Sequence, residues 1–114
     1  MMKFKVLTVI ILLAIIFHFF TGMRNAGINP RITYNNSVQY SLQANCTPCH
    51  FPPKANRKML LNTYTAAKEK IDNIIIRIMK SSKERGFMPR NHLKLADSTI
   101  NIFIKWKADG LLEK

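Results

Sequence analysis

The apolar run at residues 6–20 constrains this chain more than any other feature. The run reads VLTVIILLAIIFHFF, and only Thr8 and His18 interrupt it. The uncharged stretch continues to residue 23, a length that corresponds to about 27 Å of helix. This length lies between the apolar core of a signal peptide and a membrane span. We therefore expect residues 1–23 to form a signal-anchor or signal peptide that takes no part in a globular core.

Two basic residues, Lys3 and Lys5, precede the apolar run. Such residues hold an N-terminus in the cytoplasm, so the following chain is expected in the periplasm or on the periplasmic side of the inner membrane. The run does not end in a pair of small residues flanking one other residue, which favours an uncleaved anchor and leaves a cleaved signal peptide open. Residues 24–36 contain Gly27, Pro30 and four asparagines, and we expect them to be a polar linker.

The remaining chain, residues 37–114, is expected to form one small domain. The protein has 114 residues, with 18 Lys and Arg against 6 Asp and Glu. This length excludes a multidomain enzyme and a multi-span transporter. Two cysteines are too few for a disulfide scaffold. Because a domain of roughly 80 residues buries a modest core, a metal, disulfide or cofactor often reinforces it.

The formal net charge of +12 is a second constraint, and +10 of it remains once Lys3 and Lys5 are set aside. A positive surface favours redox partners with acidic docking surfaces, and contact with anionic lipid beside an anchor. A solvated basic surface without a partner is the other interpretation. Nucleic acid is a poor partner, because the domain is expected to be exported and carries no recognisable binding module.

The sharpest motif is CTPCH at residues 46–50. CxxCH is the attachment sequence of c-type haem. Two thiols at positions i and i+3 of a helical turn lie on the same side and can reach the two vinyl groups of one porphyrin. The histidine that follows is then directed at the iron as an axial ligand. Cys46, Cys49 and His50 are therefore the predicted haem-binding residues.

Three other interpretations of this motif are weaker. A redox dithiol would be expected in a strand–helix–strand unit, and no such pattern is present. A zinc site could count Cys46, Cys49, His50 and His92, but adjacent residues such as Cys49 and His50 share a tetrahedron with difficulty. A Cys46–Cys49 disulfide is possible in an oxidising compartment and would leave His50 without a role.

The candidates for a second axial ligand lie downstream of His50 and are Met59, Met79, Met88 and His92. Met59 is only nine residues after His50, a short path to the opposite face of a haem. Met79 falls on the apolar stripe of a helix, where methionine is more often core filler than ligand. Pro89 biases Met88 towards an extended conformation that projects its thioether from the chain. A soft sulfur suits low-spin iron, so Met88 is the predicted sixth ligand and His92 the alternative.

The CxxCH motif, the Met88-Pro89 pair and the apolar pattern of residues 95–110 together resemble a small class I monohaem cytochrome c. The resemblance covers about residues 37–114. It implies a helix that leads into CxxCH, a Met–Pro loop that supplies the sixth ligand, and a C-terminal helix that packs across the first. It also implies one haem c, held covalently, whose iron is bound by His50 and Met88. The chain departs from the family after His50, where residues 51–53 read FPP in place of a Gly-rich stretch, so the partner of the imidazole is unassigned.

We expect an all-α domain, a cytochrome c-like bundle of roughly three to five helices packed around the haem and preceded by one N-terminal hydrophobic helix. The first helix is predicted from a cap within residues 35–37 to the CxxCH motif. A long amphipathic helix is predicted from Thr63 or Thr65 to residues 81–82, and a last helix from Asp97 or Ser98 to residues 109–110. In the last helix, Ile100, Phe103 and Ile104 are expected on one face, with Ile102 and Trp106 on the other. Trp106 is expected either at a cofactor edge or in the core beside the first helix.

The expected function is that of an electron carrier rather than an enzyme, with a monomeric domain. Such a protein would move single electrons between exported redox partners. A haem-based sensor or peroxidatic protein with an open iron site is one alternative. A haem-free cationic binding module with a Cys46–Cys49 disulfide is the other.

Overall fold

The computed structural model describes residues 30–55 and 59–114. The chain divides into two units, Met1–Pro30 and Arg31–Lys114, and the second is described below. The predicted anchor at residues 1–23 lies outside the described residues. Within the described part of the chain, no helix has the length and apolar character needed to cross a membrane.

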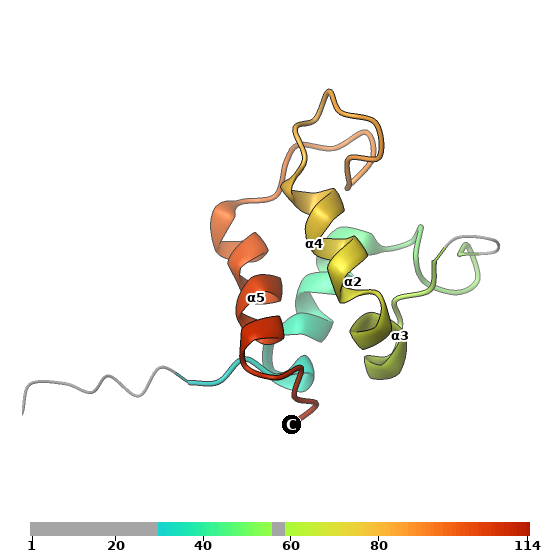
Figure 1. Cartoon of the computed structure of the whole chain (residues 1–114). Coiled ribbons are helices and arrows are strands. Elements are labelled where there is room, and N and C mark those ends of the chain that lie inside the picture. The colour runs from blue at the N-terminus through green and yellow to red at the C-terminus, as the bar shows by residue number, and fades with distance from the viewer. Residues whose placement is uncertain (1–29, 56–58) are drawn as a thin grey trace, which may run out of the picture. The chain divides into compact units, whose positions relative to one another are not determined.

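Residues 30–55 and 59–114 contain helices and loops and no β-strand, which confirms the predicted all-α class. A short π-helix, η1, leads directly into α2, and three further helices follow (Figure 1). Their bounds are Tyr34–Val38 for η1, Gln39–Cys46 for α2, Tyr64–Glu69 for α3, Ile71–Met79 for α4 and Asp97–Ala108 for α5.

The domain begins before the predicted boundary at residue 37. Thr33 caps η1 through a reciprocal pair of hydrogen bonds, in which its Oγ1 accepts from the Asn36 amide at 3.2 Å and its own amide donates to Asn36 Oδ1 at 2.9 Å. The next residue, Tyr34, is buried in the core. Residues 31–36, predicted as linker, therefore belong to the folded unit, because their polar side chains form a helix cap rather than a solvated tether.

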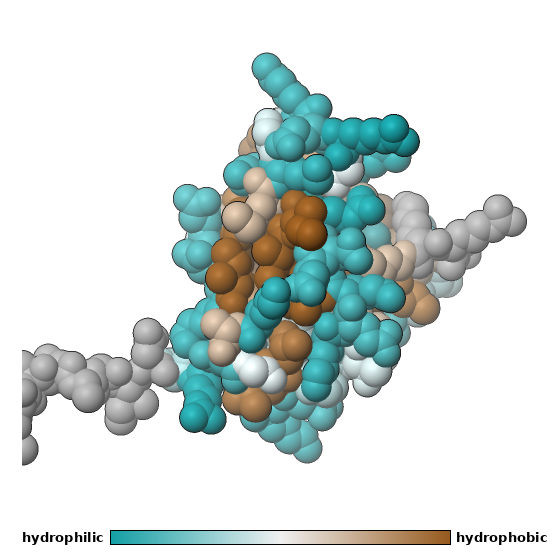
Figure 2. Space-filling model, in the orientation of Figure 1, coloured by the Kyte–Doolittle hydropathy of each residue, from teal (hydrophilic) through white to brown (hydrophobic). Residues whose placement is uncertain are grey.

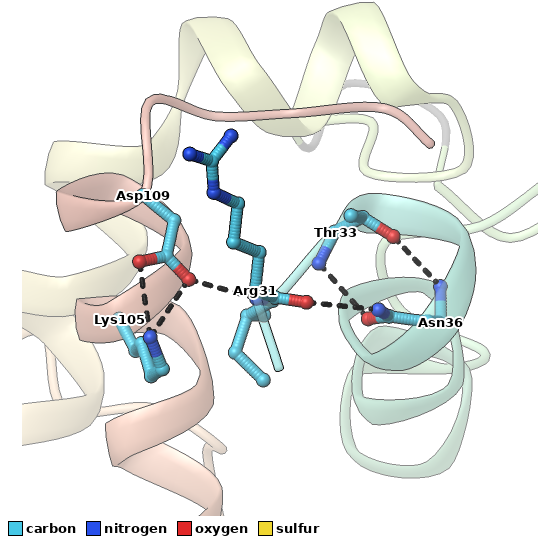
Figure 3. A network of polar contacts seen from close by, with 6 residues as sticks. Arg31, Thr33, Asn36, Lys105 and Asp109 are labelled. Carbon is cyan, nitrogen blue, oxygen red and sulfur yellow. Dashed lines mark hydrogen bonds and ion pairs between the residues drawn. The ribbon is translucent and has the colours of Figure 1, made fainter. Parts of the chain in front are cut away.

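The two ends of this unit are joined at the C-terminus of α5 (Figure 3). The Ile32 amide donates to Asp109 Oδ2 at 2.7 Å, and Lys105 Nζ lies 2.9 and 3.0 Å from the two carboxylate oxygens. Beyond this network, the Tyr34 amide donates to the Leu112 carbonyl at 2.8 Å. The segment that enters the domain is thus fixed to the segment that leaves it.

The long helix predicted between residues 63 and 82 is two helices. Thr63 caps α3, as predicted, but the chain leaves the helical conformation at Lys70, where φ is −107° and ψ is 6°. The Lys70 amide donates to the Ala67 carbonyl, a tighter i to i−3 bond that ends α3. Ala67 and Ile71 are nonetheless both buried, so the break redirects the chain while the apolar stripe stays in the core.

The core face of α5 differs from the predicted one. Ile100, Phe103 and Trp106 are buried together, whereas Ile104 is 39% exposed. The Trp106 ring lies 6.1 Å from the ring of Tyr34, and its Nε1 donates to the Leu112 carbonyl at 2.8 Å. Trp106 therefore fills the core beside the first helix, because an indole can be buried once its N–H has an acceptor.

A small apolar surface lies over α4 and α5, which run side by side in opposite directions (Figures 1 and 2). Lys107 of α5 pairs with Asp72 of α4 at 2.7 Å. One turn from this pair along each helix lie Ile104 and Ile76, the latter 58% exposed. Met79, predicted to be core filler, is 52% exposed, because it projects from the outer face of α4.

Candidate functional site

The domain contains a cavity of about 760 Å³ that gathers the predicted site residues. Cys46, Cys49 and His50 line it from the end of α2, and Met88 lines it from the loop that follows α4. Such a volume lies within the range of about 300–1,000 Å³ that is usual for small-molecule and cofactor sites. His50 and Met88, which lie 38 positions apart in sequence, thus line the same cavity.

The CxxCH segment adopts a tight turn immediately after α2. Thr47 leaves the helical conformation with ψ of 156°, and its Oγ1 donates to the Gln43 carbonyl at 2.7 Å. The His50 amide donates to the Cys46 carbonyl at 3.0 Å, which folds the segment back on itself. This turn is what brings both sulfurs and the imidazole to the cavity.

The imidazole of His50 has a defined orientation. Its Nδ1 lies 2.6 Å from the carbonyl oxygen of Met59. Because a carbonyl can only accept, Nδ1 carries the proton in this hydrogen bond, and Nε2 of the neutral ring keeps its lone pair for a metal. The Leu61 amide donates to the His50 carbonyl at 3.0 Å and fixes the same segment a second time. The Met59 carbonyl therefore supplies the partner of His50 that the sequence left unassigned.

The same contact separates the candidate sixth ligands. Met59 also lines the cavity, but its carbonyl is bonded to His50, which holds it on the histidine side. Met79 does not line the cavity. Met88 and His92 both do, with Met88 half-buried and His92 exposed. The structure thus brings Met59, Met88 and His92 to the cavity, and only Met59 is bonded to His50.

The walls of the cavity have an apolar part and a polar part. Ile74 and Ile78 face it from one side of α4, and Leu61 and Leu95 contribute from the neighbouring loops. Besides the two histidines, His50 and His92, the polar side chains at the cavity are Asn45, Thr47, Asn73, Arg77, Arg90 and Asn91. A porphyrin has an apolar ring and two carboxylates, so the residues present fit a haem group in both size and chemistry.

The state of the two cysteines bears on the competing interpretations. Both are free thiols, with Cys46 half-buried and Cys49 exposed. Burial raises the pKa of the Cys46 thiol to about 11, so this group is protonated at neutral pH and is a poor nucleophile for dithiol exchange. Among the residues that the structure describes, no three His, Cys, Asp or Glu side chains converge in a way that could hold a metal ion, as a zinc site would need.

Comparisons with known proteins gave no match to a family model, a curated protein or a solved structure. Sequence reasoning missed two parts of the site, the Met59 carbonyl and the side chain of Arg77. A backbone acceptor leaves no mark in a sequence, whereas Arg77 stands one residue before Ile78 on the apolar stripe and could have been noticed as a charge next to the core.

Proposed function

We propose that residues 31–114 hold one haem c and act as an electron carrier with His50 and Met88 as axial ligands. The observation that supports this most directly is the cavity, which the CxxCH turn, Met88 and apolar side chains of α4 line together. The defined hydrogen bond between His50 and the Met59 carbonyl supports it further, because metal-binding histidines almost always donate their other ring N–H in this way.

Each residue has a separate part in this proposal. Cys46 and Cys49 would hold the porphyrin through two thioethers, formed by adding their S–H bonds to its two vinyl groups without net oxidation. His50 and Met88 would hold the iron through a ring nitrogen and a thioether sulfur, which would leave no position for a substrate. When bound, the haem supplies an iron that exchanges one electron between its ferric and ferrous states. Ile74 and Ile78 limit the access of water, and a thioether ligand raises the reduction potential.

The remaining parts of the proposal concern location and partners. The apolar run at residues 6–20 would tether or export the domain, placing it on the periplasmic side of the inner membrane or in the periplasm. The loop between α4 and α5, which bears Met88, also carries the exposed side chains of Lys83, Arg85 and Lys94. A positive field at this edge would steer acidic redox proteins into brief encounters.

Covalent attachment can be tested on the full chain, produced in cells that attach haem c. We expect haem stain to stay with the protein on a denaturing gel, and to be lost in the double variant Cys46→Ala, Cys49→Ala. The absence of stain in the wild-type protein would contradict the proposal and favour the haem-free binding module.

Axial ligation can be tested in the same preparation by optical spectroscopy of the oxidised protein. We expect a weak far-red thioether-to-iron band that Met88→Ala abolishes. Met79→Ala is the matched control, because it removes an exposed methionine that does not line the cavity, and the band should persist. A high-spin wild-type spectrum, with ready carbon monoxide binding after reduction, would favour the sensor or peroxidatic alternative. An unchanged band in Met88→Ala would refute the ligand assignment.

A further inference from the structure

We propose that Arg77 is the positioning residue that holds Met88 in place as the sixth ligand. The inference rests on the proposed function and concerns how firmly the sixth ligand is held. Arg77 lies in the last turn of α4, lines the cavity and is half-buried. It contacts the loop that bears Met88 through both its backbone and its side chain.

The backbone contact joins the loop to the end of a helix. The last carbonyl groups of a helix have no partner within it. The Met88 amide donates to one of these, the Arg77 carbonyl, at 3.2 Å. This bond fixes the ligand residue itself to α4.

The side-chain contact joins the same helix to the start of the loop. Arg77 Nη1 donates to the Gly86 carbonyl at 3.4 Å, two residues before Met88. Gly86 has φ of +88°, a conformation that other residues rarely adopt, and Arg77 Nη1 would lie 3.5 Å from a Cβ at this position. Residues 86–88 are therefore held at both ends by one residue, and Phe87 between them is buried.

Charge alone does not explain this arrangement. Arg90 also lines the cavity and belongs to the same loop, but it is exposed. No side-chain hydrogen bond of Arg90 occurs within the described residues. Arg77→Gln and Arg90→Gln thus remove the same charge from the same cavity, and only the first removes the contact with Gly86.

The experiment titrates the oxidised full-length protein with imidazole, which competes with the Met88 thioether for the iron. Loss of the far-red band reports the displacement and gives an apparent imidazole affinity. Since a hydrogen bond from a charged donor is lost, we expect Arg77→Gln to raise the apparent imidazole affinity about tenfold. Arg90→Gln should stay within about twofold of the wild type. Gly86→Ala, which disturbs the acceptor side of the contact, should shift the affinity in the same direction as Arg77→Gln.

Two results would overturn the inference. One is an imidazole affinity of Arg77→Gln equal to that of the wild type. The other is an equal rise of the imidazole affinity in Arg90→Gln, which would show that the effect comes from charge. Arg77→Lys keeps the charge but not the guanidinium fork, and should resemble Arg77→Gln more than the wild type. If Arg77→Gln fails to fold, Gly86→Ala and Arg90→Gln decide between the two explanations. A wild-type protein without covalent haem or a far-red band would instead refute the proposed function.

Discussion

Asp109 shows how one side chain can connect the two ends of a domain. The hydrogen bond from the Ile32 amide, followed by the one from Lys105, lowers the pKa of its carboxyl group. A carboxyl with a lowered folded-state pKa stabilises the fold above the unfolded value of about 3.9, and this stabilisation is lost as the pH falls through the folded value. The contact is thus expected to contribute at neutral pH and to disappear in acid.

Replacing Asp109 with Asn should therefore lower the free energy of unfolding at pH 7. It should also make that free energy fall less between pH 7 and pH 3, because the charge that Ile32 and Lys105 stabilise is gone. Urea unfolding followed by circular dichroism at pH 7 and pH 3 measures both effects. Asp72→Asn is the control, since its pair with Lys107 is exposed and such pairs contribute about 0–1 kcal/mol. If the free energy of unfolding falls equally in the wild-type protein and in Asp109→Asn between pH 7 and pH 3, this account is wrong.

The role of His50 could be predicted from the sequence, but its hydrogen-bond partner could not. Its position after Cys49 marks it as an iron ligand in the proposed site. The acceptor for its Nδ1, however, is the backbone of Met59, reached across a loop. Any residue type at that position offers the same carbonyl, so sequence could not indicate it.

At the level of secondary-structure elements, the helix caps carry the strongest local information. Thr33 Oγ1 accepts from the Asn36 amide, and the Thr33 amide donates to Asn36 Oδ1. At the other cap, Thr63 Oγ1 accepts a single hydrogen bond from the Ala66 amide at 3.2 Å. Thr33 is also buried, and Thr63 is exposed. The two caps thus offer a matched comparison.

We expect Thr33→Ala to lower the free energy of unfolding by about 1–2 kcal/mol and Thr63→Ala by about 0.5–1 kcal/mol. The difference arises because the Asn36 amide loses its acceptor at a part-buried site, whereas the Ala66 amide lies at an exposed site and can bond to water instead. Chemical denaturation of both variants at one pH measures the order. A larger loss of stability in Thr63→Ala would show that burial does not govern these caps.

The helix elements also show where local patterns fail. The apolar stripe through residues 67–78 is continuous, and it predicts one helix. The break at Lys70 preserves the burial of Ala67 and Ile71 on either side. A pattern that both arrangements satisfy cannot distinguish them, and packing of α3 and α4 decides the outcome.

At the scale of the whole molecule, the dominant property is charge. The chain carries a formal net charge of +12, and exposed basic side chains occur on both sides of Met88 in sequence. A field of this sign attracts anions over distances that salt shortens, to about 8 Å at physiological ionic strength. The proposed carrier should therefore react with charged partners at rates that depend on salt.

We expect the bimolecular rate of electron transfer to an anionic oxidant such as ferricyanide to fall by about tenfold or more as ionic strength rises from low to near-molar values. A cationic cobalt complex should show the opposite trend, because the same field repels it. Stopped-flow measurements with the reduced protein test both. Equal salt dependence for the two oxidants would mean that the surface charge does not reach the site of electron transfer.

The sequence by itself predicted the all-α class and a C-terminal helix, which the structure places at Asp97–Ala108, and it supplied the candidate residues of the proposed haem site. These depend on spacing and residue type, which act over one or two helical turns. Only the tertiary structure decided that Trp106 lies in the core, that Met79 faces outward, and that residues 31–36 belong to the domain. It also joined His50 to the Met59 carbonyl and Arg77 to the loop of Met88. The reason is physical: a local pattern determines which face of a helix is apolar, whereas long-range packing determines what that face meets and which backbone groups find partners.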